Sequence, residues 1–377
     1  MSKLEILKKE LIAYAEAPRK AVLRSMKDTG KEAVGCFPIY TPEEIVYAAG
    51  YLPVGMWGGK AVGNKADKYL QSFCCSVMKA NMEQALDGQY DFLKAVLITA
   101  YCDTLKCIIE NWKIALPQLK VIPVIYAQNR KTNAGRVYMA EEFDRIKKEM
   151  EKLSGKEITE KDLQDALKVY EDYRIAARRF AEAAGKHPQQ ISAYERHMIL
   201  KAGWFMDKQV YTQKLEAVTA ELEAAPETDR GYRKVILTGL MSEPVELLQF
   251  LDENKLCVVA DDLAQESRQF RDAEGTGETA VEKMVSRYAK QDGCAFLYDA
   301  AKSRIELIQK LADDHNADAV VFCQMKFCDP EEFDFPLIKK NCERNDIPLL
   351  YLETELTMDG MEQIRTRIQS FAEMLIR

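Results

Sequence analysis

The chain lacks the features that mark several large classes of protein. It has no apolar run long enough to span a bilayer, and its first residues, "MSKLEILKKELIAYAEAP", form a charged amphipathic pattern without the apolar core of a signal peptide. Its net charge is −7, and no basic stripe alternates with aromatic residues. We therefore expect a cytoplasmic protein that binds neither membrane nor nucleic acid.

Nucleotide and zinc motifs are missing as well. Gly55, Gly58 and Gly59 mark a turn and do not open a helix as G-x-G-x-x-G would, and there is no P-loop, so we expect ATP hydrolysis to reside in another protein. The three histidines stand far apart, and none of the ten cysteines is paired as C-x2-C. A disulfide framework is not expected in a reducing cytosol.

The pattern of apolar runs predicts the fold class. A chain of 377 residues is too long for one ordinary core. Short β-rich runs alternate with helical patterns at both ends of the chain, which predicts parallel sheets. These runs are Leu52–Met56, Ala95–Thr99, Val121–Tyr126, Lys234–Leu240, Leu256–Ala260, Cys294–Tyr298, Ala319–Cys323 and Pro348–Leu352. We predict an α/β protein with two Rossmann- or flavodoxin-like lobes, residues 1–138 and 229–377, around a helical segment, residues 139–228, which ends in the linker "AAPETDRGYRK".

Three cysteines share one place in this pattern, between the end of a strand and the start of a helix. Cys328 lies in "KFCDPEE" and Cys102 in "YCDTLK", each before an aspartate that we predict to be the N-cap. Cys36 lies in "GCFPIYTPEE", before a capping-box pattern that begins at Thr41. A helix N-terminus lowers the pKa of a thiol and prepares it to bind metal. Since ligands collect at the carboxyl ends of parallel strands, two facing lobes could bring the three sulfurs into one cleft.

Three cysteines from distant segments favour an iron–sulfur cluster over structural zinc, which usually takes four ligands in close pairs. The alternative for each is a small buried hydrophobe. Cys74 and Cys75 in "SFCCSVMKA" also precede a helix, so one of them could be a fourth ligand or a neighbour of the cluster. The remaining cysteines are predicted to fill the core, at Cys107, Cys257, Cys294 and Cys323, or to lie on a helix surface, at Cys342.

The charged stretch "ADDLAQESRQFR" follows a strand. It predicts that Asp261 or Asp262 caps a helix, and that Glu266, Arg268 and Arg271 either line the cleft or form a solvated helix face.

Four strings carry a resemblance to a known family. "GCFPIYTPEEIVYAAGYLPVGMWGG", "YCDTLK", "VVADDLAQESRQFR" and "FCQMKFCDPEEFDFP" resemble the β subunit of the 2-hydroxyacyl-CoA dehydratases, over essentially the whole chain. The chain is most similar to subunits for apolar or small acyl groups, as in 2-hydroxyisocaproyl-CoA or lactoyl-CoA dehydratase. It is also similar to the 2-hydroxyglutaryl-CoA branch.

The resemblance implies a cofactor and partners. It implies a heterodimer with a homologous α subunit, in which each subunit holds a [4Fe-4S] cluster through three cysteines. The matching positions are Cys36, Cys102 and Cys328, and the family's "SF-x-C" position is Cys75. Some relatives have a further cysteine where this chain has Thr41, so the resemblance assigns no fourth thiolate.

The family mechanism implied by this resemblance is radical removal of water from an (R)-2-hydroxyacyl-CoA to give a 2-enoyl-CoA. One electron is added to the thioester carbonyl, the ketyl radical expels the 2-hydroxyl, and a β-proton that has become acidic is then lost. An ATP-dependent iron–sulfur activator supplies the electron. The acyl-CoA binds mainly through the α subunit, so the resemblance implies that this chain relays the electron.

Two other functions stay open from the sequence alone. One is a homodimeric ATP-dependent reductase of the benzoyl-CoA reductase or double-cubane type. The other is a metal-free two-lobed binding protein whose cysteines are core residues.

Overall fold

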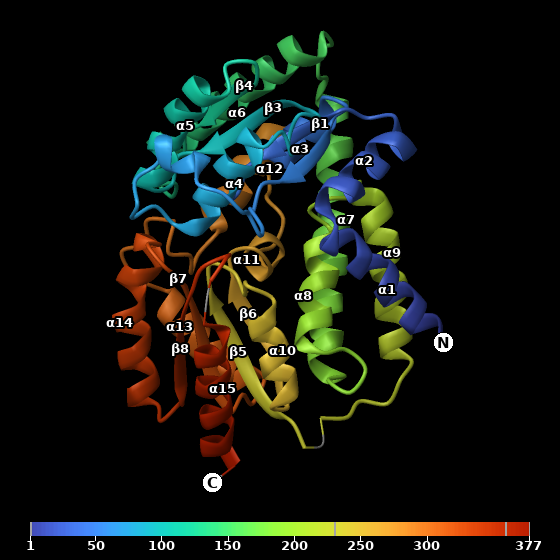
Figure 1. Ribbon diagram of the computed structural model, residues 1–377. Helices are drawn as coiled ribbons and strands as arrows, with labels where there is room; N and C mark the ends of the chain where they lie inside the picture. Colours follow the sequence, from blue (N-terminus) through green and yellow to red (C-terminus); the bar gives the residue numbers. More distant parts are fainter. Residues whose placement is uncertain (1, 230, 359, 377) are drawn as a thin grey trace.

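The computed structural model describes residues 2–229, 231–358 and 360–376. Within these ranges the chain forms an α/β structure with two separate four-stranded sheets, one from each end of the sequence, covered by helices (Figure 1). Every pair of neighbouring strands is parallel. The predicted α/β class with two parallel sheets is therefore confirmed.

The first sheet has the strand order β2-β1-β3-β4. Its strands are β1 (Ala33–Cys36), β2 (Leu52–Gly55), β3 (Leu93–Thr99) and β4 (Lys120–Val124). The connecting helices are α3 (Glu43–Ala48), the 3-10 turn η1 (Lys65–Lys68), α4 (Ser76–Leu86) and α5 (Asp103–Ala115). The chain reverses its direction of travel across the sheet between β1 and β3, and such a reversal opens a crevice at the carboxyl ends of the strands.

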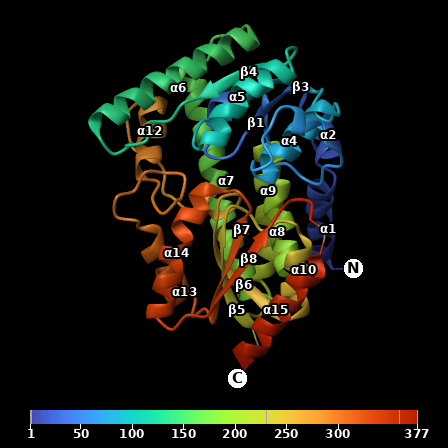
Figure 2. The same ribbon diagram turned by 60° about the vertical axis from the view of Figure 1, so that its left-hand side comes forward.

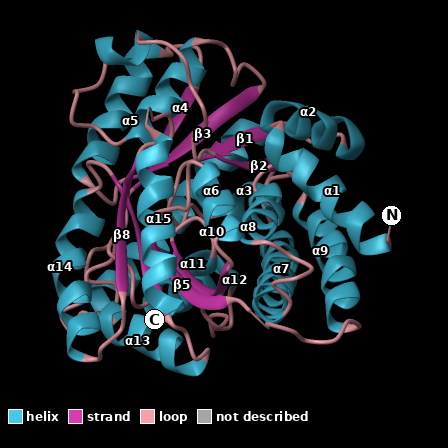
Figure 3. Cartoon of the chain, turned by 60° about the horizontal axis from the view of Figure 1, so that its bottom comes forward, coloured by secondary structure: helices cyan, strands magenta, loops and turns pink. Residues whose placement is uncertain are grey.

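The second sheet repeats this arrangement with the order β6-β5-β7-β8. Its strands are β5 (Arg233–Gly239), β6 (Leu256–Leu263), β7 (Ala319–Met325) and β8 (Leu349–Thr354). Its helices are α10 (Glu246–Glu253), α11 (Ser267–Phe270), α13 (Arg304–Asp314), α14 (Asp329–Arg344) and α15 (Met361–Ile376). Figure 3 shows both sets of strands lying among helices, which agrees with the almost complete burial of the inner strands, while β4 and β8 at one edge of each sheet are partly exposed.

A group of helices runs along the side of both sheets (Figure 1). Its members are α1 (Lys3–Glu16), α7 (Glu160–Lys186), α8 (Ala193–Ala202) and α9 (Lys208–Glu223), while α2 (Pro18–Thr29) and α6 (Asn133–Ser154) lie beside the first sheet. A capping box between Thr159 and Asp162 starts α7. Its apolar side chains repeat at helical spacing, and Leu163, Tyr170, Tyr173, Ala177, Phe180 and Ala184 are buried, while Leu167 is half-buried. Within the described residues, the segment predicted to have no strands contains helices only.

Helix α12 (Ala280–Lys290) crosses between the two halves of the molecule. It follows the second sheet's β6 in the sequence, but it lies against α6 beside the first sheet (Figure 2). A capping box between Thr279 and Glu282 starts it. The residues at which the chain divides into domains stay a prediction. Arg230, inside the predicted linker, lies outside the described residues. Within the described ranges, no helix has the length and apolar character needed to cross a bilayer.

The structure corrects three local predictions. Cys294–Tyr298 is a turn after Gly293 (φ 65°) and belongs to neither sheet. The aspartates after Cys102 and Cys328 are the first helical residues, and each cysteine is itself the N-cap. Thr41 forms no capping box, because α3 begins after Pro42 and the Thr41 hydroxyl donates to the Phe37 carbonyl instead.

Candidate functional site

Three helices begin at a cysteine, and these cysteines line one cavity. Cys75 is the N-cap of α4, Cys102 of α5 and Cys328 of α14, so the cavity joins the two halves of the chain. The other lining residues are Pro38, Ile39, Val77, Met78, Thr104, Leu105, Leu240, Phe296, Phe327, Asp329 and Pro330. We call this space the cysteine cavity. Three helix N-termini at one cavity favour negative charge there.

The local backbone explains why each cysteine faces a helix start. The Cys102 sulfur accepts a hydrogen bond from the Leu105 amide at 3.4 Å. At Cys328 the carbonyl accepts from the amides of Glu331 and Glu332, both at 3.0 Å. The sulfurs of Cys75 and Cys328 make no capping bond to their helices, which leaves them available as ligands.

The chemistry of the cavity suits a cationic cluster more than free thiolates. Burial raises the pKa of Cys102 to about 11, against the opposing effect of the Leu105 amide. Burial, together with nearby Glu331, also raises the pKa of Cys328. Among the lining residues Asp329 is the one charged side chain, and it is negative. Thiolates in this cavity therefore require a positive group between them, and sulfur ligands in an apolar setting fit iron–sulfur chemistry.

Cys75 differs from the other two. A hydrogen bond from the neighbouring Cys74 thiol outweighs burial and lowers the pKa of Cys75. The same contact raises the pKa of Cys74, so Cys75 is the better candidate of this pair for a ligand.

Cys36 lies apart from the cysteine cavity. It is the last residue of β1, it is buried, and its thiol lies 3.8 Å from the Val34 carbonyl. Burial and Glu43 raise the pKa of its thiol. Pro38 and Ile39, two and three residues further on, line the cavity in its place. The structure thus brings Cys102 and Cys328 together with Cys75, and leaves Cys36 outside.

The spacing of these cysteines does not suit a single ion. Among the described residues, no three His, Cys, Asp or Glu side chains form a group that could hold one metal ion. In an iron–sulfur cubane each thiolate binds a different iron, so its cysteines must stand further apart than around one ion.

Two of the other cysteine predictions are wrong. Cys107 lies on the exposed face of α5, and Cys342 lies on the buried face of α14. Cys257, Cys294 and Cys323 are buried as predicted.

The charged stretch 260–271, which begins within β6, is mostly buried and forms ion pairs, among them the pair of Arg268 with Glu331 near Cys328. Asp261 and Asp262 lie within β6 and cap no helix, which corrects the prediction. Asp262 binds Arg268, Arg271 and Arg304 at 2.5 to 3.0 Å. Glu266 and Arg268 are almost completely buried, so this stretch is not a solvated helix face. The alternation of acidic and basic residues directly after a buried strand was the signal for this network.

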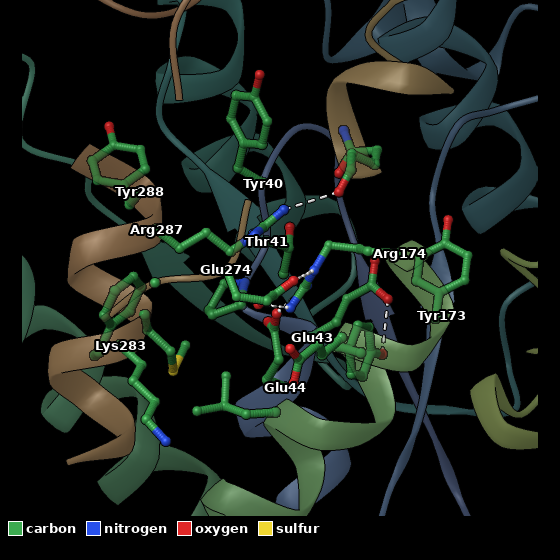
Figure 4. Close-up of a pocket in the computed structure, with 18 of the residues that line it drawn as sticks. Tyr40, Thr41, Glu43, Glu44, Tyr173, Arg174, Glu274, Lys283, Arg287 and Tyr288 are labelled. Carbon is green, nitrogen blue, oxygen red and sulfur yellow. Dashed lines mark hydrogen bonds and ion pairs between the residues drawn. The ribbon is translucent and has the colours of Figure 1, made fainter. Parts of the chain in front are cut away.

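A second cavity, of about 320 Å³, lies where the Tyr40–Glu44 loop, α7 and α12 meet (Figure 4). Five tyrosines contribute to its lining, at Tyr40, Tyr126, Tyr170, Tyr173 and Tyr288. Arg174 crosses this region and binds Glu44 at 2.9 Å and Glu274 at 2.5 Å. We call this space the tyrosine cavity. Nothing in the sequence pattern indicated it, because it joins three segments that are distant along the chain.

Comparison with known proteins gives one consistent result. Residues 38–375 match the family model described as "2-hydroxyglutaryl-CoA dehydratase, D-component". The chain is 39% identical over 381 residues to the lactoyl-CoA dehydratase subunit beta of Anaerotignum propionicum, covering all of both chains. It is 38% identical over 360 residues to the (R)-phenyllactyl-CoA dehydratase beta subunit of Clostridium sporogenes, covering 96% of each chain. It is 35% identical over 365 residues to the (R)-2-hydroxyglutaryl-CoA dehydratase subunit beta of Acidaminococcus fermentans, covering 95% of this chain and 96% of that one.

Proposed function

The chain belongs to the 2-hydroxyglutaryl-CoA dehydratase D-component family, and on that premise we propose that it is the iron–sulfur electron-relay subunit of a 2-hydroxyacyl-CoA dehydratase. Its relatives are dehydratases, so the enzyme is a lyase. The observation that carries the relay proposal is the convergence of three cysteine N-caps, from both halves of the chain, on one cavity.

We propose Cys75, Cys102 and Cys328 as the ligands of a [4Fe-4S] cluster, with Cys75 in the place for which the sequence analysis predicts Cys36. When bound, such a cluster would supply one-electron transfer. The three helix N-termini would stabilise the negative charge of the thiolates. Apolar side chains around them, among them Leu240 and Phe296, would limit the access of water.

The proposed partners follow from the names of the relatives. A beta subunit implies a second subunit, which we propose to be a homologous α subunit that binds most of the acyl-CoA. Phe73 and Phe327, next to the cysteine-bearing segments in sequence, are 67% and 36% exposed, and Phe333 on α14 is 78% exposed. Exposed aromatic side chains of this kind support burial against a partner. The electron would come from a separate ATP-hydrolysing activator, because the sequence has no phosphate-binding glycine loop.

The decisive experiment compares cysteine variants purified without oxygen together with any copurifying subunit. Cys75→Ser, Cys102→Ser and Cys328→Ser should each lose most of the iron and sulfide per chain and the broad visible absorption. Serine is itself a preferred N-cap, so the three helices should still start normally. Cys36→Ser and Cys323→Ser are the controls, and folded protein of both should retain its iron. Cys323→Ser costs about 1–3 kcal/mol if its hydroxyl is unsatisfied.

The outcomes separate the alternatives. If Cys36→Ser loses iron while Cys75→Ser retains it, the ligand set predicted from the sequence (Cys36, Cys102 and Cys328) is right, and the set proposed from the structure (Cys75, Cys102 and Cys328) is wrong. Wild-type protein without iron would indicate a metal-free binding protein. A homodimer that is active without a second kind of subunit would indicate the reductase.

A further inference from the structure

The tyrosine cavity is separate from the cysteine cavity, and the proposed electron relay does not use it. Tyr40 lines the tyrosine cavity and the preceding residue, Ile39, lines the cysteine cavity, so a single loop separates the two spaces. A volume of about 320 Å³ is at the lower end of small-molecule sites. The question is which ligand its walls fit.

Most charged side chains of this cavity already have partners. Arg174 binds Glu44 and Glu274, and Lys208 lies 3.5 Å from Glu43. Lys168 pairs with Asp172 one turn further along α7. The fourth lining carboxylate, Glu171, is half-exposed. These groups balance one another and leave little net charge for a ligand.

Two cations on α12 are different. Lys283 and Arg287 are one turn apart, and among the described residues neither has a carboxylate within 4 Å. Lys283 donates to the Gln164 side chain at 2.7 Å, and Arg287 donates to the Gln269 carbonyl at 2.9 Å, both uncharged acceptors. The Nε of Arg287 is buried without any partner in the described structure. In Figure 4 the Arg287 side chain extends from α12 toward the middle of the lining residues.

The charge and the shape of the cavity both favour an anionic ligand with an apolar body. Burial and repulsion from Arg174 lower the pKa of Arg287, against the opposing attraction of Glu44 and Glu274, neither of which is within ion-pair distance. Asp272 also interacts with this arginine but lies beyond ion-pair distance. The cavity wall also includes apolar side chains, among them Phe143 from α6, Leu167 from α7 and Met284 from α12.

We propose that the tyrosine cavity binds a small organic carboxylate. Its carboxylate would lie against Arg287 and Lys283, where the Arg287 Nε gains an acceptor, and its apolar body would lie against Phe143, Leu167 and Met284. Arginine suits this task because its planar donors match the two carboxylate oxygens. The proposal does not depend on the cluster ligands, and it can fail while they stand.

The test is calorimetric titration of the full chain, as purified with any partner subunit, with hexanoate. The neutral analogue 1-hexanol has the same length, and inorganic phosphate tests for an unselective anion site. Wild-type protein should bind hexanoate at least tenfold more tightly than 1-hexanol or phosphate. Arg287→Gln should weaken hexanoate binding at least tenfold and leave the binding of 1-hexanol unchanged. Because the substitution is in this chain, the loss assigns the site even with a partner present.

Arg179→Gln is the matched control, since Arg179 lies on the exposed side of α7 and pairs with Glu223 on α9. It should bind hexanoate as wild type does. Lys283→Gln, at a half-buried position, is a second variant should Arg287→Gln not fold, and it should weaken hexanoate binding severalfold. Equal affinity for hexanoate and 1-hexanol, equal affinity for phosphate, or unchanged affinity in the two cavity variants would each overturn the proposal.

Discussion

Arg268 Nη1 donates to Glu331 Oε1 at 2.8 Å, and neither side chain is exposed to solvent. Glu331 lies in the first turn of α14, three residues after Cys328. The same guanidinium makes two hydrogen bonds of 3.0 Å to the Asp262 carboxylate in β6. One buried cation therefore ties the second sheet to the helix whose N-cap lines the cysteine cavity.

We expect Arg268→Met to destabilise the protein by about 1.5–3 kcal/mol, because Asp262 and Glu331 each lose a charge-assisted hydrogen-bond partner, while Arg304 still binds both carboxylates. The measurement is urea unfolding followed by circular dichroism. The double variant Arg268→Met/Glu331→Gln should recover part of the loss, since the buried negative charge that has lost its Arg268 partner is then removed. A double variant less stable than Arg268→Met would contradict the pairing.

Arg365→Met is the control for this prediction. Arg365 pairs with Glu253 at 2.9 Å, but both side chains are about half exposed. Exposed pairs contribute about 0–1 kcal/mol, so the variant should unfold within about 1 kcal/mol of wild type.

Thiol labelling gives a second prediction. Cys107 is the one exposed cysteine among the ten, all of which lie in the described structure. Burial raises the pKa of Cys323 to about 12 and that of Cys342 to about 11, so these thiols are both inaccessible and protonated at pH 8. Native protein should react quickly with one equivalent of Ellman's reagent, and Cys107→Ser with none. Two fast equivalents in the wild type would show that the fold is more open than described.

Much of the fold followed from the sequence, because parallel strands buried on both faces are continuous apolar runs. Seven of the eight predicted runs became strands, and the exception, Cys294–Tyr298, has similar composition but follows a glycine with positive φ and pairs with no strand. Composition alone does not distinguish a buried strand from a buried turn. The wrong predictions for Cys107 and Cys342 have a related cause. A position within a helix does not by itself show whether the side chain lies on the buried or the exposed face.

The candidate site could be predicted only in part. The sequence places Cys102 and Cys328 at the carboxyl edge of a sheet because a strand ends and a helix starts there, and both side chains line the cysteine cavity. Cys36 satisfied the same pattern, but the chain runs on through Pro38 and Ile39 before α3, and those residues reach the cavity instead. Cys75 follows no strand directly, so its place at the cavity depends on how α4 packs, which is a tertiary property.

Gly239 gives a third prediction, about the end of β5. Its φ is 134°, and a methyl group built on its Cα would lie 2.1 Å from the backbone oxygen of Cys323 in the neighbouring β7. Gly239→Ala should therefore destabilise the protein by more than about 3 kcal/mol, as backbone strain of about 1–3 kcal/mol is added to a clash with a carbonyl that cannot move freely. The readout is again the midpoint of urea unfolding.

Gly50→Ala separates strain from the clash. Gly50 also has a positive φ, 85°, but nothing lies within 4 Å of the added methyl group. This variant should lose only about 1–2 kcal/mol. Equal losses at the two positions would mean that β5 and β7 are not packed as closely as the structure has them.

His197 lies between two carboxylates in the buried network beside β6. Its Nδ1 is 2.7 Å from Glu266 Oε1 and its Nε2 is 3.2 Å from Glu243 Oε1. Since a carboxylate accepts and does not donate, both ring nitrogens must carry protons to satisfy this geometry. Burial alone would lower the pKa of His197, but these two hydrogen bonds outweigh it and the pKa is raised above its usual 6.5. For Glu243, Lys201 and His197 outweigh burial and lower the pKa to about 2.

These shifts give the stability a defined pH dependence. The His197 contribution is complete below pH 6.5 and is lost as the pH rises through the raised pKa, because the folded protein then also releases the proton. The Glu243 contribution is present above pH 4.5 and is lost as the pH falls toward about 2. The free energy of unfolding, measured with urea, should therefore decline as the pH rises above 6.5 in the wild type and decline less in His197→Gln. His315→Gln, at the end of α13, is the matched control and should keep the wild-type slope. If His197→Gln keeps that slope too, folding does not raise the pKa of His197, and the interpretation of its two hydrogen bonds is wrong.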